Sequence, residues 1–411
     1  MSQLHIAHFT NTYLPVTSGV VRSVRSFRRA LVELGHLVFI FAQHASDYVD
    51  EEPFIFRYPA LELPLQEYPL TIPFSNFVEK VLPPLKLDVI HAHHPLLLGQ
   101  VAANKAEELD VPLVFTHHTR YQEYSHYVAL PQELVKDVIE RWLADYMERC
   151  QHVVVPSESI KALLEKRYGI HERVTAVPTG IDLEPYKQAD GRSIRQQRGW
   201  DDKLVFISIG RLAEEKNWVT LLKAAVPVFK QHPQTHLAIV GDGDDRRELE
   251  KLAQKLGISR QVEFVGKVPF DAIPSYLKAA DIFAFASITE TQGLVTLEAM
   301  AAGLPIVAVD ATGTSDAVTH NVEGLLTPND AEALGEAMAR LVTQANLRAQ
   351  FAEAACLKAE TFENKRMGQR LLDVYRQARA DKKANRYVVG DKHKPIFQIN
   401  WRKILGLEEA V

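Results

Sequence analysis

Residues 287–303 read SITETQGLVTLEAMAAG, and two carboxylates in this stretch, Glu290 and Glu298, lie eight positions apart on either side of Gly293. The residues just before it, 281–286 (DIFAFA), form a short, aromatic and apolar run, which is typical of a buried strand. After Gly293, apolar residues recur at helical spacing until a glycine and a proline end the pattern. The stretch therefore predicts a strand, a tight turn and a helix that begins at the turn.

A strand, a turn of small residues and a helix start form an anion site, because the first helical amides have no intrahelical acceptor and the helix dipole favours negative charge. A diphosphate fits such a site. Glu298, about one turn into the helix, would repel phosphate, so we expect it to accept hydrogen bonds from sugar hydroxyls such as those of a ribose. Glu290, on the loop, would face the group attached beyond the phosphates. The alternative is a capped amphipathic helix with a solvated glutamate, which is commoner for any single unit of this kind.

Two cations follow another predicted strand, residues 204–209, in the segment GRLAEEKN, residues 210–217. Gly210 allows a tight turn there. Arg211 can give a forked contact to a phosphate, and Lys216 can give a point charge. We expect these two side chains to converge on a phosphate. The alternative is that they are two exposed cations near a helix start.

Two groups of residues raise the question of a metal ion. In IHAHHP, residues 90–95, His91 and His93 share one face of a strand, but a third ligand at a clear spacing is missing. Asp242 and Asp244 form an Asp-x-Asp in a turn after another predicted strand, where aspartate is common as a cap and turn residue. We therefore predict no metal and no other cofactor.

The first half of the chain alternates strand and helix patterns, which predicts a parallel sheet with helices on both faces. Ligands gather at the carboxyl ends of such strands. A glycine loop that contains Gly19 joins the first strand to the first helix, and the absence of a Gly-x-Gly-x-x-Gly fingerprint there argues against a dinucleotide oxidoreductase. The predicted strands of this half are residues 4–10, 37–42, 88–92, 113–116 and 152–155, and the later helices are residues 96–108, 132–150 and 157–168.

Length and composition indicate a globular protein of two domains. The chain has 411 residues, 46% hydrophobic and 24% charged, which exceeds one ordinary domain. Its net charge of −5 argues against nucleic acid as a partner. Two cysteines give no disulfide framework, and the chain has no apolar run of about 18 residues. We therefore expect a cytoplasmic protein that does not span a membrane.

The segment ETQGLVTLEAMAAGLPIVA, with its Glu-x7-Glu, resembles the nucleotide-sugar signature of glycosyltransferase family 4. These are retaining enzymes of the GT-B fold, in which two Rossmann-like domains with parallel sheets face each other across a cleft. The resemblance covers about residues 4–375 and implies an α/β protein of this fold. It also implies an N-terminal acceptor-side domain at 1–178, a nucleotide-sugar-binding domain at 179–375, and a basic aromatic tail at 376–411.

The resemblance assigns roles to individual residues. It implies that Glu298 holds the donor ribose, that the amides of Leu294 and Val295 contact the diphosphate, and that two cations clamp that diphosphate. Where the family has Gly-Gly-Val before the first helix, this chain has Ser18 before Gly19, so only the second glycine is carried over. The implied donor-binding residues are Gly19, Arg211, Lys216, Leu294, Val295 and Glu298, and the implied catalytic-site residues are His118 and Glu290.

The loop HHTRYQEYSHYV, residues 117–128, resembles the bacterial diacylglycerol glucosyltransferase branch of the family. That resemblance implies that four residues line the acceptor side of the cleft, namely Tyr121, Tyr124, His126 and Tyr127. From residue 376 onward, nine Lys and Arg stand against four Asp and Glu, and Phe397 and Trp401 lie among them. This composition suits an anionic lipid surface, so we expect a peripheral contact with the inner face of the cell membrane.

The resemblance thus implies a retaining hexosyltransferase that moves glucose from UDP-glucose, its nucleotide-sugar donor, to diacylglycerol or another membrane lipid. Two alternatives stay open. One is transfer to a soluble sugar or sugar-phosphate acceptor. The other is a GT-B nucleotide-sugar 2-epimerase, which would share the diphosphate site but would need acid and base carboxylates at the sugar ring.

Overall fold

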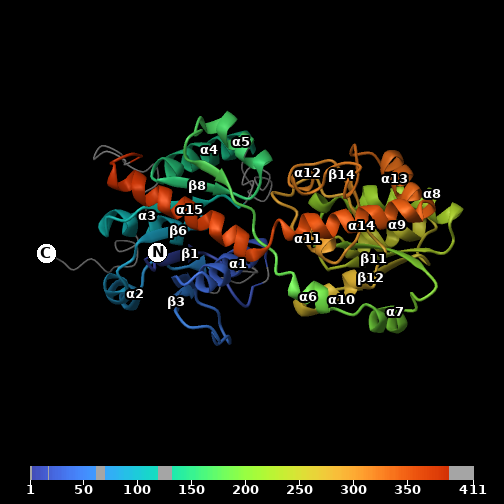
Figure 1. The fold of residues 1–411 in the computed structure, drawn as a ribbon, viewed down its shortest axis with the longest axis horizontal. Coiled ribbons are helices and arrows are strands. Elements are labelled where there is room, and N and C mark those ends of the chain that lie inside the picture. The colour runs from blue at the N-terminus through green and yellow to red at the C-terminus, as the bar shows by residue number, and fades with distance from the viewer. Residues whose placement is uncertain (1, 17, 62–69, 119–131, 388–411) are drawn as a thin grey trace. The chain divides into compact units, whose positions relative to one another are not determined.

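The computed structural model describes residues 2–16, 18–61, 70–118 and 132–387, and the chain forms two compact units (Figure 1). The first unit holds the residues up to Gly180 together with the segment that starts at Asn364, and the second holds Ile181–Glu363. Each unit is built around one large parallel sheet. The predicted α/β architecture with two parallel sheets is therefore confirmed.

The first unit has a seven-stranded sheet in the order β3-β2-β1-β6-β7-β8-β9, and every neighbouring pair is parallel. A short antiparallel pair, β4 with β5, forms a separate two-stranded sheet. The strands are β1 (His5–Thr10), β2 (Leu37–Gln43), β3 (Ile55–Tyr58), β4 (Ala60–Leu61), β5 (Leu70–Thr71), β6 (Val89–Ala92), β7 (Leu113–Thr116), β8 (His152–Val155) and β9 (Val174–Ala176). The helices are α1 (Gly19–Glu33), α2 (Asn76–Val81), a 3-10 helix (Pro83–Leu85), α3 (Leu98–Glu108), α4 (Gln132–Glu148), α5 (Glu158–Tyr168) and α15 (Asn364–Lys383).

The second unit has a six-stranded sheet in the order β12-β11-β10-β13-β14-β15, again with parallel neighbours only. Its strands are β10 (Leu204–Ile209), β11 (Thr235–Val240), β12 (Val262–Gly266), β13 (Ile282–Phe285), β14 (Ile306–Val309) and β15 (Gly324–Thr327). Its helices are α6 (Glu184–Gln188), α7 (Arg192–Arg198), a 3-10 helix (Glu214–Lys216), α8 (Trp218–Gln231), α9 (Arg246–Lys255), a 3-10 helix (Phe270–Ala272), α10 (Ile273–Lys278), α11 (Leu294–Ala301), α12 (Thr314–Ala317), α13 (Ala331–Thr343) and α14 (Ala345–Glu360).

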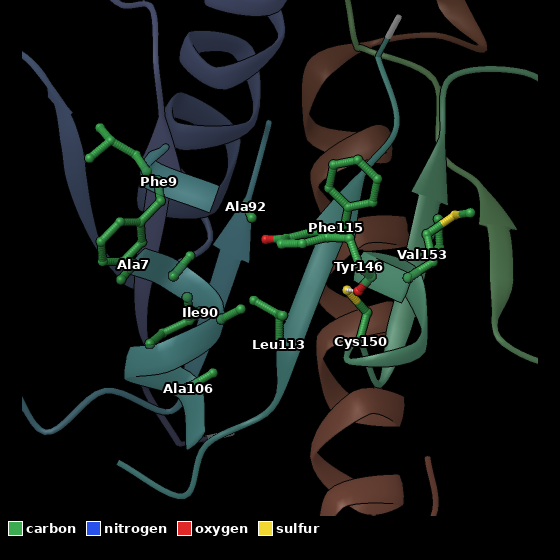
Figure 2. Close-up of a cluster of buried hydrophobic side chains, with 14 of the residues drawn as sticks. Ala7, Phe9, Ile90, Ala92, Ala106, Leu113, Phe115, Tyr146, Cys150 and Val153 are labelled. Atoms are coloured by element: carbon green, nitrogen blue, oxygen red, sulfur yellow. Dashed lines mark hydrogen bonds between the residues drawn. The ribbon is translucent and has the colours of Figure 1, made fainter. Parts of the chain in front are cut away.

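Each sheet carries an apolar layer on both faces, because successive residues of a strand point to opposite sides. In the first unit Phe9 and Phe115 belong to one buried cluster, whereas Ile6 and Val114 belong to the other. Figure 2 shows the first of these clusters, in which the ring of Phe115 packs edge-on against Tyr146 with 5.1 Å between the centroids. The second unit repeats this arrangement with two buried clusters of its own.

Helix α15 belongs to the first unit, which corrects the expected domain boundary at residue 375. The expected boundary assigned residues 364–375 to the second domain. Hydrophobic periodicity identifies the apolar face of a helix but not the sheet that this face will cover. In the structure, α15 packs against α1, and its ion pairs Arg379–Asp88 (2.8 Å) and Lys382–Asp110 (2.9 Å) also stay within the first unit. The buried apolar residues of α15 are Met367, Leu371, Leu372, Val374, Tyr375 and Ala378.

Helix α15 lies close to α1 at Gly368, so a larger side chain at this position should destabilise the protein. A Cβ atom at this position would lie 2.5 Å from the Cβ atom of Ala30, with both backbones fixed in helices. We expect Gly368→Val to lower the free energy of unfolding by about 1–3 kcal/mol, the usual cost of overpacking. Urea denaturation followed by circular dichroism measures this change.

The matched control is Ala380→Val, which adds valine at an exposed position of the same helix. Its cost should stay below about 1 kcal/mol, the helix-propensity difference alone. Equal costs for the two variants would contradict the close packing of α15 on α1.

Candidate active site

In the second unit, β13 leads through a turn into α11, as the sequence predicts. The turn ends at Gly293, whose φ of 73° lies in the left-handed region that favours glycine. Gly293 is also the N-cap of α11 and offers no side chain to the first helical amides, which include those of Leu294 and Val295. Glu298 lies further along α11 and is 3% exposed. The start of α11 therefore has the amide arrangement that binds anions.

The turn before α11 is held by a second glycine, from the loop after β14. Gly313 has a φ of 79°, and a Cβ atom there would lie 2.7 Å from the carbonyl oxygen of Glu290 and 2.8 Å from the nitrogen of Gln292. Any larger residue would push this loop away. The backbone of the turn is thus fixed by close packing of glycine against it.

Glu290 and Lys216, which come from separate motifs, form an ion pair with 2.5 Å between Nζ and Oε1. The hydroxyl of Ser287 donates to the same carboxylate oxygen at 2.9 Å. Both side chains are largely buried, with 22% of the lysine and 15% of the glutamate side chain exposed. The attraction is therefore screened less than that of a surface pair. The pair places a cation beside the turn that precedes α11.

Arg211 lies on the same loop as Lys216, but its guanidinium pairs with Glu215 at 2.5 Å and is about half exposed. The structure therefore places each of the two expected clamp cations beside a carboxylate. The loop itself is tied to the end of β13, because Asn217 donates from Nδ2 to the carbonyl of Ala286 at 3.0 Å. The indole of Trp218 also donates to the carbonyl of Arg211 at 2.9 Å. These bonds hold the cationic loop at the carboxyl edge of the sheet.

Asp242 behaves as a turn residue, as the sequence analysis expects. Its Oδ1 accepts a hydrogen bond from the amide of Gly243 at 2.9 Å, and its Oδ2 lies 3.8 Å from Arg246. Among the described residues, neither Asp242 nor Asp244 belongs to a group of three side chains able to hold a metal ion. A Cβ atom at Gly243 would lie 2.4 Å from the carbonyl oxygen of Leu212, so this turn packs tightly against the cationic loop.

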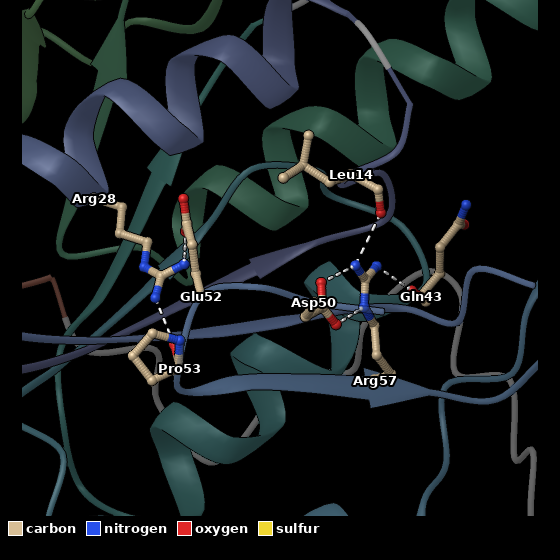
Figure 3. A network of polar contacts seen from close by, with 7 residues as sticks. All are labelled: Leu14, Arg28, Gln43, Asp50, Glu52, Pro53 and Arg57. Atoms are coloured by element: carbon tan, nitrogen blue, oxygen red, sulfur yellow. Dashed lines mark hydrogen bonds and ion pairs between the residues drawn. The ribbon is translucent and has the colours of Figure 1, made fainter. Parts of the chain in front are cut away.

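In the first unit, Gly19 begins α1, and Ser18 caps that helix by accepting a hydrogen bond from Val21 at 3.3 Å. A Cβ atom at Gly19 would meet nothing within 4 Å among the surrounding atoms. The loop before it is anchored by Arg57, which donates to the carbonyl of Leu14 at 2.9 Å (Figure 3). Figure 3 also shows the bidentate contact of Arg57 with Asp50, and the separate pairing of Arg28 with Glu52.

The carboxyl ends of β1, β6 and β7 carry a cluster of buried imidazoles. His8 of β1 lies opposite His91 of β6 in the parallel register. Nδ1 of His8 is 2.7 Å from Nε2 of His93, and Nδ1 of His93 is 2.8 Å from Nε2 of His118. The phenol of Tyr375 on α15 is 2.7 Å from Nδ1 of His91 and 3.3 Å from Nε2 of His8. The cluster therefore links α15 to the predicted site residue His118.

Sequence reasoning identified His118, His91 and His93 but missed His8 and Tyr375. His8 is buried in the first strand, and only the strand register shows that it meets the histidines of β6. Tyr375 lies far away in the sequence, and its helix was expected in the other domain. The expected acceptor-side residues, Tyr121, Tyr124, His126 and Tyr127, lie outside the described residues. Of the expected tail at 376–411, the residues up to 383 belong to α15, and residues 388–411 lie outside the described part of the chain.

The structure supplies the third imidazole that the metal hypothesis lacked, because candidate ligand atoms of His8, His91 and His93 lie within 4.8 Å of one another. Each ring nitrogen of these three residues already has a hydrogen-bond partner, however. The second nitrogen of His91, Nε2, lies 2.6 Å from the hydroxyl of Thr116. A hydrogen-bonded network therefore accounts for this donor set without a metal ion.

Comparison with known proteins decides the family. The model described as Glycosyltransferase Family 4 matches residues 17–185, and the model described as Glycosyl transferases group 1 matches residues 190–357. Two curated relatives, the alpha-monoglucosyldiacylglycerol synthases of Acholeplasma laidlawii and Streptococcus pneumoniae, are 33% and 31% identical to this chain. Each match covers 74% of this chain, and the matches cover 80% and 71% of the two relatives. The chain belongs to glycosyltransferase family 4.

Solved structures agree with this family 4 assignment at the level of the fold. The crystal structure of the Anabaena protein HepE in complex with UDP and glucose matches 90% of this chain and 98% of its own, with a TM-score of 0.70 and 21% identity. The predicted GT-B fold is thereby confirmed. The family models and the two relatives confirm the predicted class of hexosyltransferase. The roles of individual residues in this family 4 enzyme stay predictions.

The buried imidazoles make the stability of the family 4 enzyme depend on pH. Burial lowers the pKa of His8 to about 3, and it lowers the pKa of His94 and of His117 to about 4. An unfolded histidine titrates near about 6.5, so above that pH the imidazoles are neutral in both states. Below it the unfolded chain binds more protons, and the free energy of unfolding falls as the pH approaches the folded pKa values.

We therefore expect acid to destabilise the first unit selectively. At pH 5 each of these three histidines should lower the free energy of unfolding by on the order of 2 kcal/mol relative to pH 7.5. Hydrogen exchange under increasing urea, read by mass spectrometry on peptides from β1 and β6, measures this change. Peptides from β10 and β11 serve as the internal reference. Equal stability of β1 and β6 at the two pH values would contradict neutral burial of the imidazoles.

Proposed function

We propose that this enzyme transfers glucose from UDP-glucose to a hydroxyl of diacylglycerol, with retention of the anomeric configuration. The observation that carries the donor half of the proposal is the Lys216–Glu290 pair at the turn that leads into the uncapped start of α11. The acceptor half is supported by the two relatives that are named as alpha-monoglucosyldiacylglycerol synthases. The UDP and glucose in the HepE complex support the choice of donor.

The donor diphosphate would bind at the first amides of α11, including those of Leu294 and Val295, where the helix dipole favours negative charge. Lys216 and Arg211 would add two positive charges to that site. In the transition state, negative charge grows on the leaving diphosphate, so fixed cations and amides lower the barrier by stabilising it. Glu298, buried further along the helix, would accept hydrogen bonds from the ribose.

From the first unit, we assign His118 to contact the donor sugar and Gly19 to leave room for it. The open space around Gly19 supports its part in this assignment. No carboxylate is assigned as a covalent nucleophile. The retained configuration would instead arise from attack by the acceptor hydroxyl on the same face from which the diphosphate leaves.

We place the enzyme in the cytoplasm, in peripheral contact with the inner face of the cell membrane. Diacylglycerol is itself a membrane lipid, so the active site has to work at a lipid surface. No helix in the described part of the chain has the length and apolar character needed to cross a bilayer. From 376 onward nine basic residues stand against four acidic ones. Arg379 and Lys382 of α15 already pair with aspartates of the first unit, so attraction to anionic headgroups would come from the other basic residues.

The clamp assignment predicts that Arg211→Ala and Lys216→Ala each lower kcat/KM on the order of 100-fold, the usual cost of removing one stabilising contact to a developing charge. The measurement is the rate of UDP release with saturating acceptor. The matched control is Lys251→Ala, which removes an exposed lysine that pairs with Glu248 on α9. It should leave the rate close to that of the wild type.

Loss of Lys216 also leaves the carboxylate of Glu290 without its cation, which can lower stability. The double variant Lys216→Met, Glu290→Gln removes both charges, so its free energy of unfolding shows how much of the instability of Lys216→Ala comes from the unpaired carboxylate. A stably folded double variant with wild-type turnover would contradict the clamp.

The acceptor assignment predicts that labelled glucose from UDP-glucose appears in a lipid-soluble product. The enzyme is incubated with vesicles that contain diacylglycerol, with and without anionic lipid, and in parallel with soluble sugars and sugar phosphates. We expect one glucosyl lipid for each UDP released, with an α-linkage by NMR and faster formation on anionic vesicles. Water-soluble product alone would contradict the lipid acceptor. Epimerised donor formed without any acceptor would favour the 2-epimerase alternative.

A further inference from the structure

The loop that joins β6 to α3 in the first unit is held by an asparagine that follows β1. Oδ1 of Asn11 accepts a hydrogen bond from the amide of Leu98 at 3.0 Å, and Nδ2 of Asn11 donates to the carbonyl of Leu96 at 3.1 Å. A Cβ atom at Gly99 would lie 1.8 Å from the carbonyl oxygen of His94, so the loop also packs directly against the start of α3. The backbone of this loop is therefore fixed from both sides.

Leu97, in the middle of the same loop, has an unusual backbone conformation, with a φ of 51° and a ψ of −106°. A bulky residue at a positive φ is strained, and it persists only where the surrounding structure fixes it. Such positions gather at ligand sites. The preceding residue, Leu96, is 50% exposed. The strained loop thus holds an apolar residue open to solvent at the carboxyl edge of the sheet, which is the edge where ligands bind.

His94, at the start of this loop, is held as one tautomer. Its Nδ1 accepts a hydrogen bond from the backbone amide of Asn11 at 3.1 Å, and a backbone amide can only donate. Burial of most of the ring lowers the pKa of His94 to about 4, so near pH 7 the ring is neutral and carries one proton. That proton lies on Nε2, because Nδ1 uses its lone pair. The hydroxyl of Thr10, 3.5 Å from Nδ1, donates instead to the carbonyl of Thr12 at 2.8 Å.

The Nε2–H group of His94 is available to a ligand. Among the residues that the structure describes, the partners of the ring are Asn11 and Thr10, and both lie at Nδ1. His94 is only partly buried, and its Nε2 is open to solvent. The structure therefore fixes the position and the tautomer of this donor before any ligand binds, which lowers the entropy cost of binding.

The loop offers one hydrogen-bond donor and apolar surface, and its residues 94–97 (HPLL) include no Lys, Arg, Asp or Glu. A sugar phosphate would need cations, and a free sugar would need several polar partners. An ester group beside a hydrocarbon chain needs one donor for its carbonyl and an apolar contact for its chain. Diacylglycerol has two such ester carbonyls. The chemistry of the loop therefore fits a neutral ester lipid better than a soluble sugar acceptor.

We propose that this loop is an acceptor subsite, in which Nε2–H of His94 donates to an ester carbonyl of diacylglycerol and Leu96 packs against the adjoining acyl chain. The proposal rests on the proposed function, because it names the part of the enzyme that recognises the lipid. Asn11 is a positioning residue of the acceptor subsite, since it fixes both the loop and the tautomer of the imidazole. The subsite also lies at the same sheet edge as His118, which follows the neighbouring strand β7.

The test compares diacylglycerol with a dialkylglycerol of the same chain length, which has ether oxygens and no ester carbonyl, both in mixed micelles. We expect the wild-type KM for the dialkylglycerol to be roughly threefold to tenfold higher, the effect of one lost hydrogen bond. His94→Asn keeps an oxygen for the amide of Asn11 but has no donor at the position of Nε2. This variant should show the higher KM with both lipids, while kcat and the KM for UDP-glucose stay unchanged.

Two further variants separate the roles of the ring. His94→Gln carries an amide nitrogen that can reach the position of Nε2, so it should restore part of the preference for the ester. Leu96→Ala should raise the KM for both lipids on the order of threefold, because both have hydrocarbon chains. The matched control is Leu357→Ala, which truncates a leucine of α14 that is 59% exposed. It should change neither KM.

The tautomer gives a readout that does not depend on turnover. Nuclear magnetic resonance of the full-length protein with 15N-labelled histidine separates a protonated from an unprotonated ring nitrogen. At pH 7.5 we expect His94 to be neutral with its proton on Nε2, and its signal is assigned by its loss in His94→Asn. A proton on Nδ1 would overturn the acceptor subsite, because Nε2 would then have no hydrogen to donate to a carbonyl.

The outcomes separate this proposal from the proposed function. Glucosyl lipid formed from both lipids with equal KM would overturn the acceptor subsite and leave the proposed function standing. A preference for the ester that persists in His94→Asn would do the same. Failure of the wild type to form any glucosyl lipid would overturn the proposed function and the subsite with it. If His94→Asn does not fold, the wild-type comparison of the two lipids and the KM of Leu96→Ala still decide.

Discussion

Parallel pairing of strands decides which distant loops of this chain meet, because the carboxyl ends of parallel strands lie at one edge of a sheet. In the second unit β10 and β13 are neighbours, so the loops that follow them adjoin. Asn217 ties these loops together through Ala286, and the Lys216–Glu290 pair forms between them. In the first unit β1, β6 and β7 are neighbours, which brings the histidines together. Strand order therefore brings the members of each group of candidate residues together.

The cost of burying a polar group explains which residues occupy the sheet edge of the first unit, where the histidines lie. An imidazole inside a sheet core loses its hydration, and each ring nitrogen left without a partner would cost further free energy. Burial makes His8, His91 and His93 neutral, and mutual hydrogen bonds then satisfy all their ring nitrogens. One partner comes from Tyr375 on α15. The return of the chain to the first unit is therefore needed both for packing against α1 and for satisfying the buried histidines.

The sequence was sufficient to predict local structure and insufficient to predict long-range partners. Runs such as 113–116 and 152–155 are apolar and bounded by polar residues, and they form strands at the predicted bounds. The turn at Gly293 was equally readable, because only a few residues tolerate a positive φ. The sequence did not reveal that His8 faces His91, because that depends on strand register. The pairing of Lys216 with Glu290 joins motifs 74 residues apart and requires the strand order.

The Lys216–Glu290 pair also constrains which ligand the donor side can favour. Because the two side chains are mostly buried, the binding of an anion to Lys216 alone would leave a negative carboxylate beside another negative group. A diphosphate carries more negative charge than a carboxylate, so it can replace Glu290 as the ion-pair partner of Lys216. The hydroxyl of Ser287 can continue to donate to Glu290. The remaining acceptor capacity of Glu290 is then best satisfied by ligand hydroxyl groups. A ligand that joins a diphosphate to a polyhydroxyl group meets both requirements, whereas a free phosphate or a free sugar meets only one.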